Sequence, residues 1–168
     1  KIEYLSDRFM ELVKFAVETA ASLSMQVILY DEGMYPSGSA HGMVVQNNPD
    51  FASKGLKMIE CSVEEYGNYN DNIITVLAAH KISENMIDAQ SVIPYEQGKE
   101  IGDRKLFIFI MEFTGGHIRG IHFGEDDWED HAPSSADLLN PKAVRKFIQL
   151  THERYYEILS EYFGKTII

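Results

Sequence analysis

The sequence predicts an α/β fold that carries an inserted small antiparallel β subdomain. Three observations lead to this prediction: a helical pattern near the start of the chain runs into a short apolar segment, a second helical pattern near the end does the same, and a block of short β-rich runs separates the two. Alternating helix and buried strand is typical of α/β architecture. The expected divisions are residues 1–55, 56–123 and 124–168, with the insertion in the middle.

The first helix is predicted over residues 6–24. Its apolar side chains recur at three- and four-residue spacing and so gather on one face. Ser6 is a favourable N-cap, and Leu5 with Met10 fits a hydrophobic staple across it. Residues 25–30 (MQVILY) follow as an apolar run without alternation. Such a run is typical of a strand buried on both faces, as in a parallel sheet.

The segment after this strand, residues 31–42 (DEGMYPSGSAHG), is dense in glycine, serine and proline and predicts a loop at the carboxyl end of the strand. Short β-rich runs separated by turn residues then indicate a small antiparallel sheet. These runs are residues 56–63, 73–80, 86–93 and 106–113.

The last part of the chain begins with an acidic, irregular stretch, residues 124–136. A second helix opens on Asn140-Pro141, a favoured pairing of N-cap and first helical residue. Residues 165–168 have the character of a further buried strand. Because the chain opens on a helix and ends within this strand, we expect it to be a fragment of a longer protein.

Charge and composition exclude several classes of function. The net charge is -11, from 15 basic and 26 acidic side chains, which disfavours binding to nucleic acid or to an anionic membrane but leaves a neutral sugar unaffected. No apolar run approaches the roughly 20 residues that a membrane span needs. Cys61 is the single cysteine, and no histidine pair has metal-ligand spacing. We therefore expect neither a metal nor a cofactor.

Two adjacent carboxylates stand where the predicted strand meets its loop, the place at which α/β folds gather functional groups. Asp31 or Glu32 could accept hydrogen bonds from sugar hydroxyls, or act as an acid or base. Because neighbours in a strand point to opposite sides, at most one of them is expected to face a pocket. The alternative is that these carboxylates bind backbone N–H groups of the loop.

Aromatic side chains on the two predicted loops are candidates for sugar stacking. Tyr30, Tyr35 and Trp128 each combine a flat apolar face with a polar edge, which suits a pyranose ring and equally suits ordinary packing. His41, on the glycine-rich loop, is a further candidate pocket residue. The acidic stretch has oxygen ligands for calcium but lacks the spacing of an EF-hand loop, and a solvated loop is the preferred interpretation.

Two blocks of the sequence resemble a group of bacterial glycoside hydrolases related to the α-L-rhamnosidases. Residues 5–42 match a helix, a strand ending in a Tyr-Asp-Glu element and a Trp-Pro-Ser-Gly-type loop, and residues 137–168 match a later helix–strand unit. The resemblance implies a partial (β/α) TIM-barrel-type unit, with Tyr30, Asp31, Glu32 and Ser37 in the substrate loop. Tyr35 stands where the group usually has Trp, and His41 where it usually has Gly.

The expected function is hydrolysis of glycosidic bonds by the full-length parent, with Glu32 and Asp31 as the catalytic candidates and a carbohydrate as the substrate. Glycosidases need two flanking carboxylates, and the resemblance places a second one beyond Ile168, so we expect no turnover by this chain alone. The first alternative is a non-catalytic carbohydrate-binding or regulatory module. The second is an association surface, in which unpaired sheet edges produce a homo-oligomer.

Overall fold

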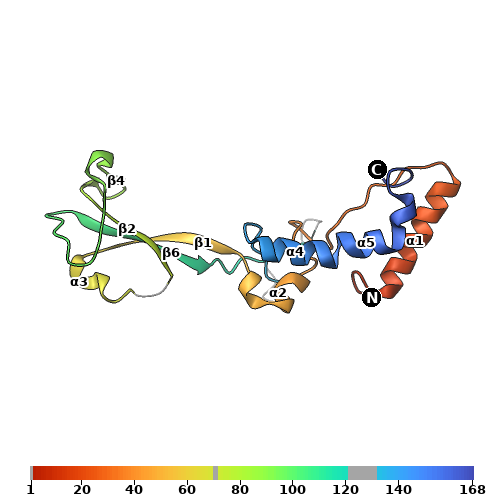
Figure 1. The fold of residues 1–168 in the computed structure, drawn as a ribbon, viewed down its shortest axis with the longest axis horizontal. Coiled ribbons are helices and arrows are strands. Elements are labelled where there is room, and N and C mark those ends of the chain that lie inside the picture. The colour runs from red at the N-terminus through yellow and green to blue at the C-terminus, as the bar shows by residue number, and fades with distance from the viewer. Residues whose placement is uncertain (1, 70–71, 121–131) are drawn as a thin grey trace. The chain divides into compact units, whose positions relative to one another are not determined.

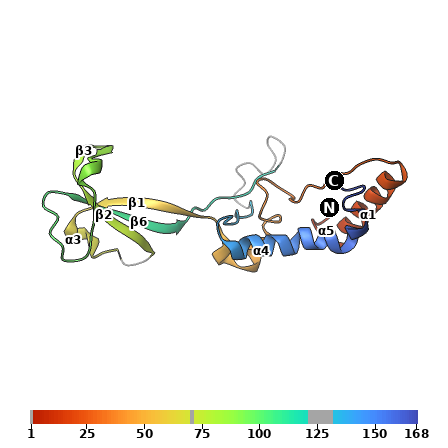
Figure 2. The same ribbon diagram turned by 45° about the horizontal axis from the view of Figure 1, so that its top comes forward.

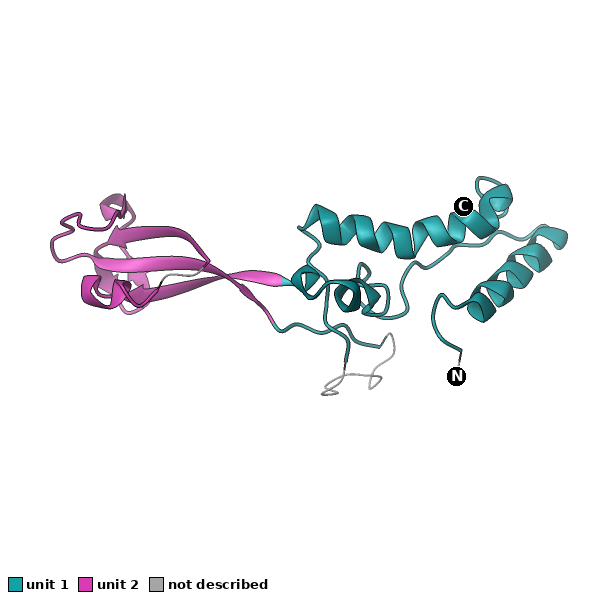
Figure 3. Ribbon diagram, turned by 60° about the horizontal axis from the view of Figure 1, so that its bottom comes forward, with its two compact units in different colours: residues 1–53, 115–168 teal, residues 54–114 magenta. Residues whose placement is uncertain are grey.

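The structure is a computed structural model that describes residues 2–69, 72–120 and 132–168 of the chain (Figure 1). The chain divides into two compact units, shown in different colours in Figure 3. Unit 1 consists of residues 1–53 and 115–168, and unit 2 consists of residues 54–114. Most of the helical residues lie in unit 1, and the paired strands lie in unit 2.

Unit 1 begins with α1 (Asp7–Ser22), which starts where the sequence predicts because the Ser6 hydroxyl accepts a hydrogen bond from the Phe9 N–H. The second predicted helix also begins at its expected cap, since the Asn140 side chain accepts from the Lys142 N–H. This helix is divided at Thr151. The remaining elements are α2 (Met43–Asn47), η1 (Pro49–Phe51), α4 (Pro141–Leu150), α5 (His152–Leu159) and η3 (Ser160–Tyr162).

Two clusters of buried side chains hold unit 1 together. One joins α1 to α5 and includes Met10, Val17, Tyr155, Leu159 and Ile167. The other joins α2 to α4 and includes Ala40, Val44, Ala136, Ala143 and Phe147. The loop that contains Asp31 and Glu32 runs from the first cluster to the second, so its two ends are fixed by apolar burial.

Unit 2 is an antiparallel sheet with the strand order β1-β6-β2-β5, beside a two-stranded pair of β3 and β4 (Figure 2). Side chains from one face of the larger sheet form its core, with Leu106 and Ile108 fully buried. The elements are β1 (Lys54–Cys61), α3 (Val63–Tyr66), β2 (Ile73–Ala79), β3 (Lys81–Ser83), β4 (Met86–Ile87), η2 (Ala89–Ser91), β5 (Ile93–Pro94) and β6 (Lys105–Phe113).

The predicted α/β fold class, a partial (β/α) TIM-barrel-type unit, is wrong. Every paired strand within the described residues is antiparallel, and those strands do not close into a barrel. Residues 25–30 and 165–168, which were expected to be parallel strands, make a single parallel bridge between Val27 and Ile167. Its two hydrogen bonds run from the Val27 N–H to the Thr166 carbonyl and from the Ile168 N–H to the Val27 carbonyl.

The physical reason for the error lies in the exposure of residues 25–30. Val27 and Leu29 pack against the cluster between α1 and α5, whereas Ile28 and Met25 are 81% and 58% exposed. The run is therefore partly buried, and on one face only. Its mostly apolar composition, without alternation, suggested that both faces were covered, but composition does not say whether a second layer of structure packs on the other face.

Among the described residues, no helix has both the length and the apolar character needed to cross a bilayer.

Candidate functional site

Glu32 organises the loop that follows the extended segment. Its side chain is 3% exposed, and its two carboxylate oxygens accept four backbone N–H groups at 2.5 to 2.9 Å. The donors are Gly33, Ser39, Ala40 and His41. A carboxylate has about four lone-pair sites, so Glu32 has no acceptor capacity left for a substrate hydroxyl.

The backbone around Glu32 is held in an uncommon conformation. Ala40 and His41 are both left-handed, with φ of 49° and 53°, although neither is glycine. Such a residue costs about 1–2 kcal/mol of conformational energy. The carboxylate compensates because the left-handed turn aims successive N–H groups at one point, where its negative charge lies.

Asp31, the neighbouring acid, has a different environment. Its Oδ1 accepts a hydrogen bond from the Ser37 hydroxyl at 2.8 Å, and its Oδ2 lies 3.4 Å from Nε2 of His152. The side chain is 33% exposed. With two of about four acceptor sites engaged, the Asp31 carboxylate keeps capacity for a ligand.

His152 is placed by the junction between α4 and α5. The buried Thr151 hydroxyl donates to the Phe147 carbonyl at 2.8 Å and lies 3.0 Å from Nδ1 of His152. Because this hydroxyl has one hydrogen, Nδ1 is the donor in the second contact. Nε2 of the same ring lies 3.4 Å from Oδ2 of Asp31, so the imidazole connects the helix junction to the carboxylate.

A cavity of about 580 Å³ opens beside this pair, and we call it the Asp31 cavity. Its volume is in the range of small-molecule sites. One wall is apolar and aromatic, with the rings of Tyr156 and Phe163 5.6 Å apart at an angle of 50°. Acidic and basic groups supply the rest of the lining. The lining residues are Leu29, Asp31, His152, Glu153, Tyr155, Tyr156, Glu157, Phe163, Ile167 and Ile168.

A second cavity, of about 620 Å³, shares Tyr155 with the first, and we call it the Tyr4 cavity. Gly33 allows the Tyr4 and His41 rings of this cavity to lie close to the backbone. A Cβ at position 33 would lie 3.1 Å from Nδ1 of His41 and 3.2 Å from Cγ of Tyr4. The lining residues are Ile2, Glu3, Tyr4, Phe9, Tyr30, Glu32, Gly33, His41 and Tyr155.

The predicted site residues fall into separate groups. Asp31 and Ser37 are hydrogen-bonded to each other beside the Asp31 cavity, whereas Tyr30, Glu32 and His41 line the Tyr4 cavity. Tyr35 lines neither; its backbone pairs with Arg119, whose guanidinium lies 5.1 Å from the Tyr35 ring centroid. Trp128 lies outside the described residues.

Sequence reasoning missed His152, Tyr155 and Tyr156. These residues belong to the helical pattern near the end of the chain, where they were expected only as part of a helix. A helical pattern shows which side chains share a face but not which distant segment packs against that face. The available signal was Thr151, a polar residue on the apolar side of the helix, with the exposed His152 next to it.

Comparison of the chain with models of protein families, with curated proteins and with solved structures finds no match. Within the described part of the chain, no group of His, Cys, Asp and Glu side chains is arranged to hold a metal ion.

Proposed function

We propose that the Asp31 cavity binds a carbohydrate, in a protein that acts on glycosides. The observation that carries this proposal is an open carboxylate next to an aromatic wall. Asp31 keeps free acceptor sites for sugar hydroxyls, and Tyr156 and Phe163 offer apolar ring surface to the C–H face of a pyranose. The resemblance to the glycoside hydrolases related to the α-L-rhamnosidases supports the same ligand class.

This proposal changes the roles expected for the two acids. Asp31 is the ligand-facing carboxylate, and Ser37 and His152 position it through Oδ1 and Oδ2. Glu32 holds the loop in place and takes no part in chemistry, because its acceptor sites are filled by backbone N–H groups. The aromatic platform is formed by α5 and the residues after it, not by Tyr35.

The test is a binding titration with methyl glycosides of L-rhamnose, D-galactose, D-glucose and D-xylose, followed by NMR. We expect at least one to bind and Asp31→Asn to weaken it about tenfold, because a charged hydrogen-bond partner contributes about 1.5–3 kcal/mol. Asp50→Asn is the matched control, since Asp50 is an exposed acid of the same unit that lines neither cavity. Equal affinities for the two variants, or no binding of any glycoside, would contradict the proposal.

Hydrolysis is the second candidate function. It is favoured by Glu153 and Glu157, which line the same cavity as Asp31 and supply further carboxylates from a second element. The discriminating measurement uses the p-nitrophenyl α-L-rhamnoside in the same titration series. Release of nitrophenolate that Asp31→Asn abolishes supports hydrolysis, whereas binding without release supports a binding role for this chain.

A further inference from the structure

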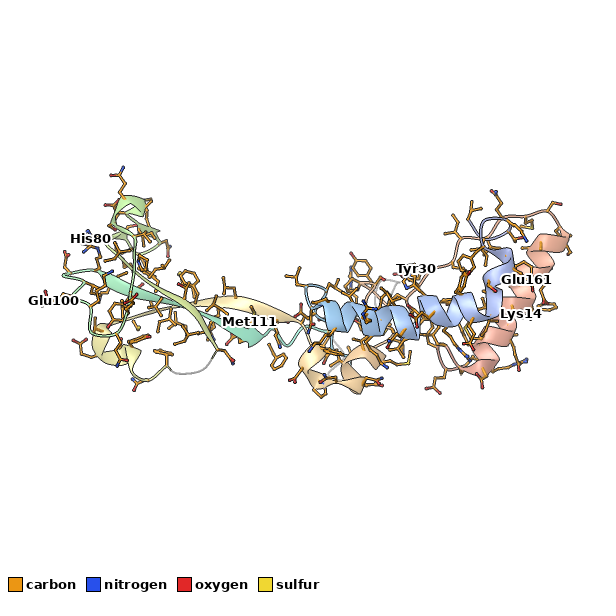
Figure 4. The ribbon with its side chains drawn as sticks, in the orientation of Figure 1. Lys14, Tyr30, His80, Glu100, Met111 and Glu161 are labelled. Carbon is orange, nitrogen blue, oxygen red and sulfur yellow. The ribbon has the colours of Figure 1, made fainter. Side chains whose placement is uncertain are left out.

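The walls of the Tyr4 cavity are mostly aromatic rings set at steep angles to one another. The Tyr4 ring centroid lies 5.3 Å from that of Phe9 at 68°, and 6.2 Å from that of His41 at 51°. Tyr30 and Tyr155 are the other aromatic residues of the lining, and Figure 4 labels Tyr30 on its extended segment. Rings set at such angles do not stack flat on one another, so their faces point in different directions within one lining.

The electrostatic environment of this cavity is negative. Glu3 and Glu32 contribute carboxylates to the lining, and no Lys or Arg lines it within the described residues. Burial raises the pKa of the Tyr4 hydroxyl, and the Tyr155 hydroxyl and the charges of Glu32 and Asp31 raise it further. Partial burial and the same two carboxylates raise the pKa of Tyr30. The tyrosines therefore remain neutral in a field that favours cations.

The Glu32 carboxylate favours a cation that donates no hydrogen bond. Its charge is present in the lining, but its acceptor sites are filled by backbone N–H groups. It can therefore attract a positive charge without accepting another hydrogen bond. A quaternary ammonium group needs no acceptor, because its nitrogen carries no hydrogen, and the faces of aromatic rings attract it directly.

We infer that the Tyr4 cavity is an aromatic cage for a quaternary ammonium ion. The inference does not rest on the proposed carbohydrate function, because it concerns a different cavity and a different charge of ligand. Glu32 then has two tasks, holding the loop through its hydrogen bonds and attracting the ligand through its charge.

The probe is choline, compared with 3,3-dimethylbutan-1-ol, which has the same shape and no charge. In an NMR titration of the full chain we expect choline to bind at least tenfold more tightly than the alcohol. Equal affinity for the two compounds would show a merely apolar pocket and overturn the inference. Absence of choline binding would overturn it as well.

Two tyrosines provide a matched pair of variants, since Tyr30 and Tyr35 are both 51% exposed and lie close together in the sequence. Only Tyr30 lines the cavity. Tyr30→Ala should weaken choline binding about tenfold, and Tyr30→Phe should keep it within about threefold, because the ring face and not the hydroxyl holds the cation. Tyr35→Ala should leave affinity unchanged. Equal losses in Tyr30→Ala and Tyr35→Ala would contradict the assignment.

Discussion

At the scale of single residues, Asp31 and Glu32 are chemically similar neighbours with different partners. Glu32 is buried among backbone donors, whereas Asp31 contacts two side chains and solvent. Glu32→Gln turns one acceptor oxygen into an NH₂ group that faces backbone N–H groups. We expect it to lower the free energy of unfolding by about 2–4 kcal/mol, measured by urea denaturation.

The control for this prediction is Asp31→Asn, which changes the same atoms one residue away. Because Asp31 is partly exposed and its contact with His152 lies in reach of water, we expect a loss below about 1 kcal/mol. If Asp31→Asn destabilises the chain as much as Glu32→Gln, the structural role does not belong to Glu32 alone.

The sequence could predict these two residues as candidates but not divide their roles. Alternation along an extended segment allows at most one of two neighbours to face a given side, and it does not say which. The donors that occupy Glu32 come from residues 33–41, and their position depends on left-handed Ala40 and His41. Left-handed alanine has no sequence signature, so the closed loop could not be foreseen.

At the scale of elements, helix starts were predictable and strand partners were not. Ser6 and Asn140 cap α1 and α4 as expected, because capping depends on a few adjacent residues. Residues 25–30 were expected in a parallel sheet but form only one bridge. Their sequence could not predict this outcome, because strand pairing depends on segments that are distant in the chain. The division between α4 and α5 at Thr151 also went unpredicted, since threonine does not by itself interrupt a helix.

The α4–α5 junction links helix geometry to the proposed sugar site. Thr151→Val keeps the shape of the side chain but removes the hydroxyl that fixes Nδ1 of His152. We expect methyl glycoside binding to weaken by about threefold, less than for Asp31→Asn, because His152 acts on the ligand only through Asp31. NMR of the His152 ring nitrogens provides the second measurement, and an unchanged Nδ1 signal would contradict the hydrogen-bond assignment.

At the scale of the whole molecule, the two units have separate cores. The buried clusters of unit 1 contain residues from α1, α2, α4, α5 and their adjoining segments, and the cluster of unit 2 contains only residues between Ile59 and Ile110. The chain enters unit 2 at Lys54 and leaves it at Thr114, and Lys54 is directly paired in the antiparallel ladder with Phe113, the residue before Thr114. Unit 2 is therefore attached through two neighbouring backbone positions.

This arrangement predicts that unit 2 can be removed. Replacing residues 55–112 with Asn-Gly joins Lys54 to Phe113 by a two-residue hairpin turn, the connection that suits directly paired antiparallel residues. We expect the shortened chain to keep the helical circular dichroism of unit 1 and to bind choline and the methyl glycoside within about threefold of the full chain, because both cavities are lined by unit 1 alone. Loss of the helical signal would show that unit 1 depends on unit 2 to fold. Retained helix with loss of both ligands would instead show that unit 2 contributes to binding.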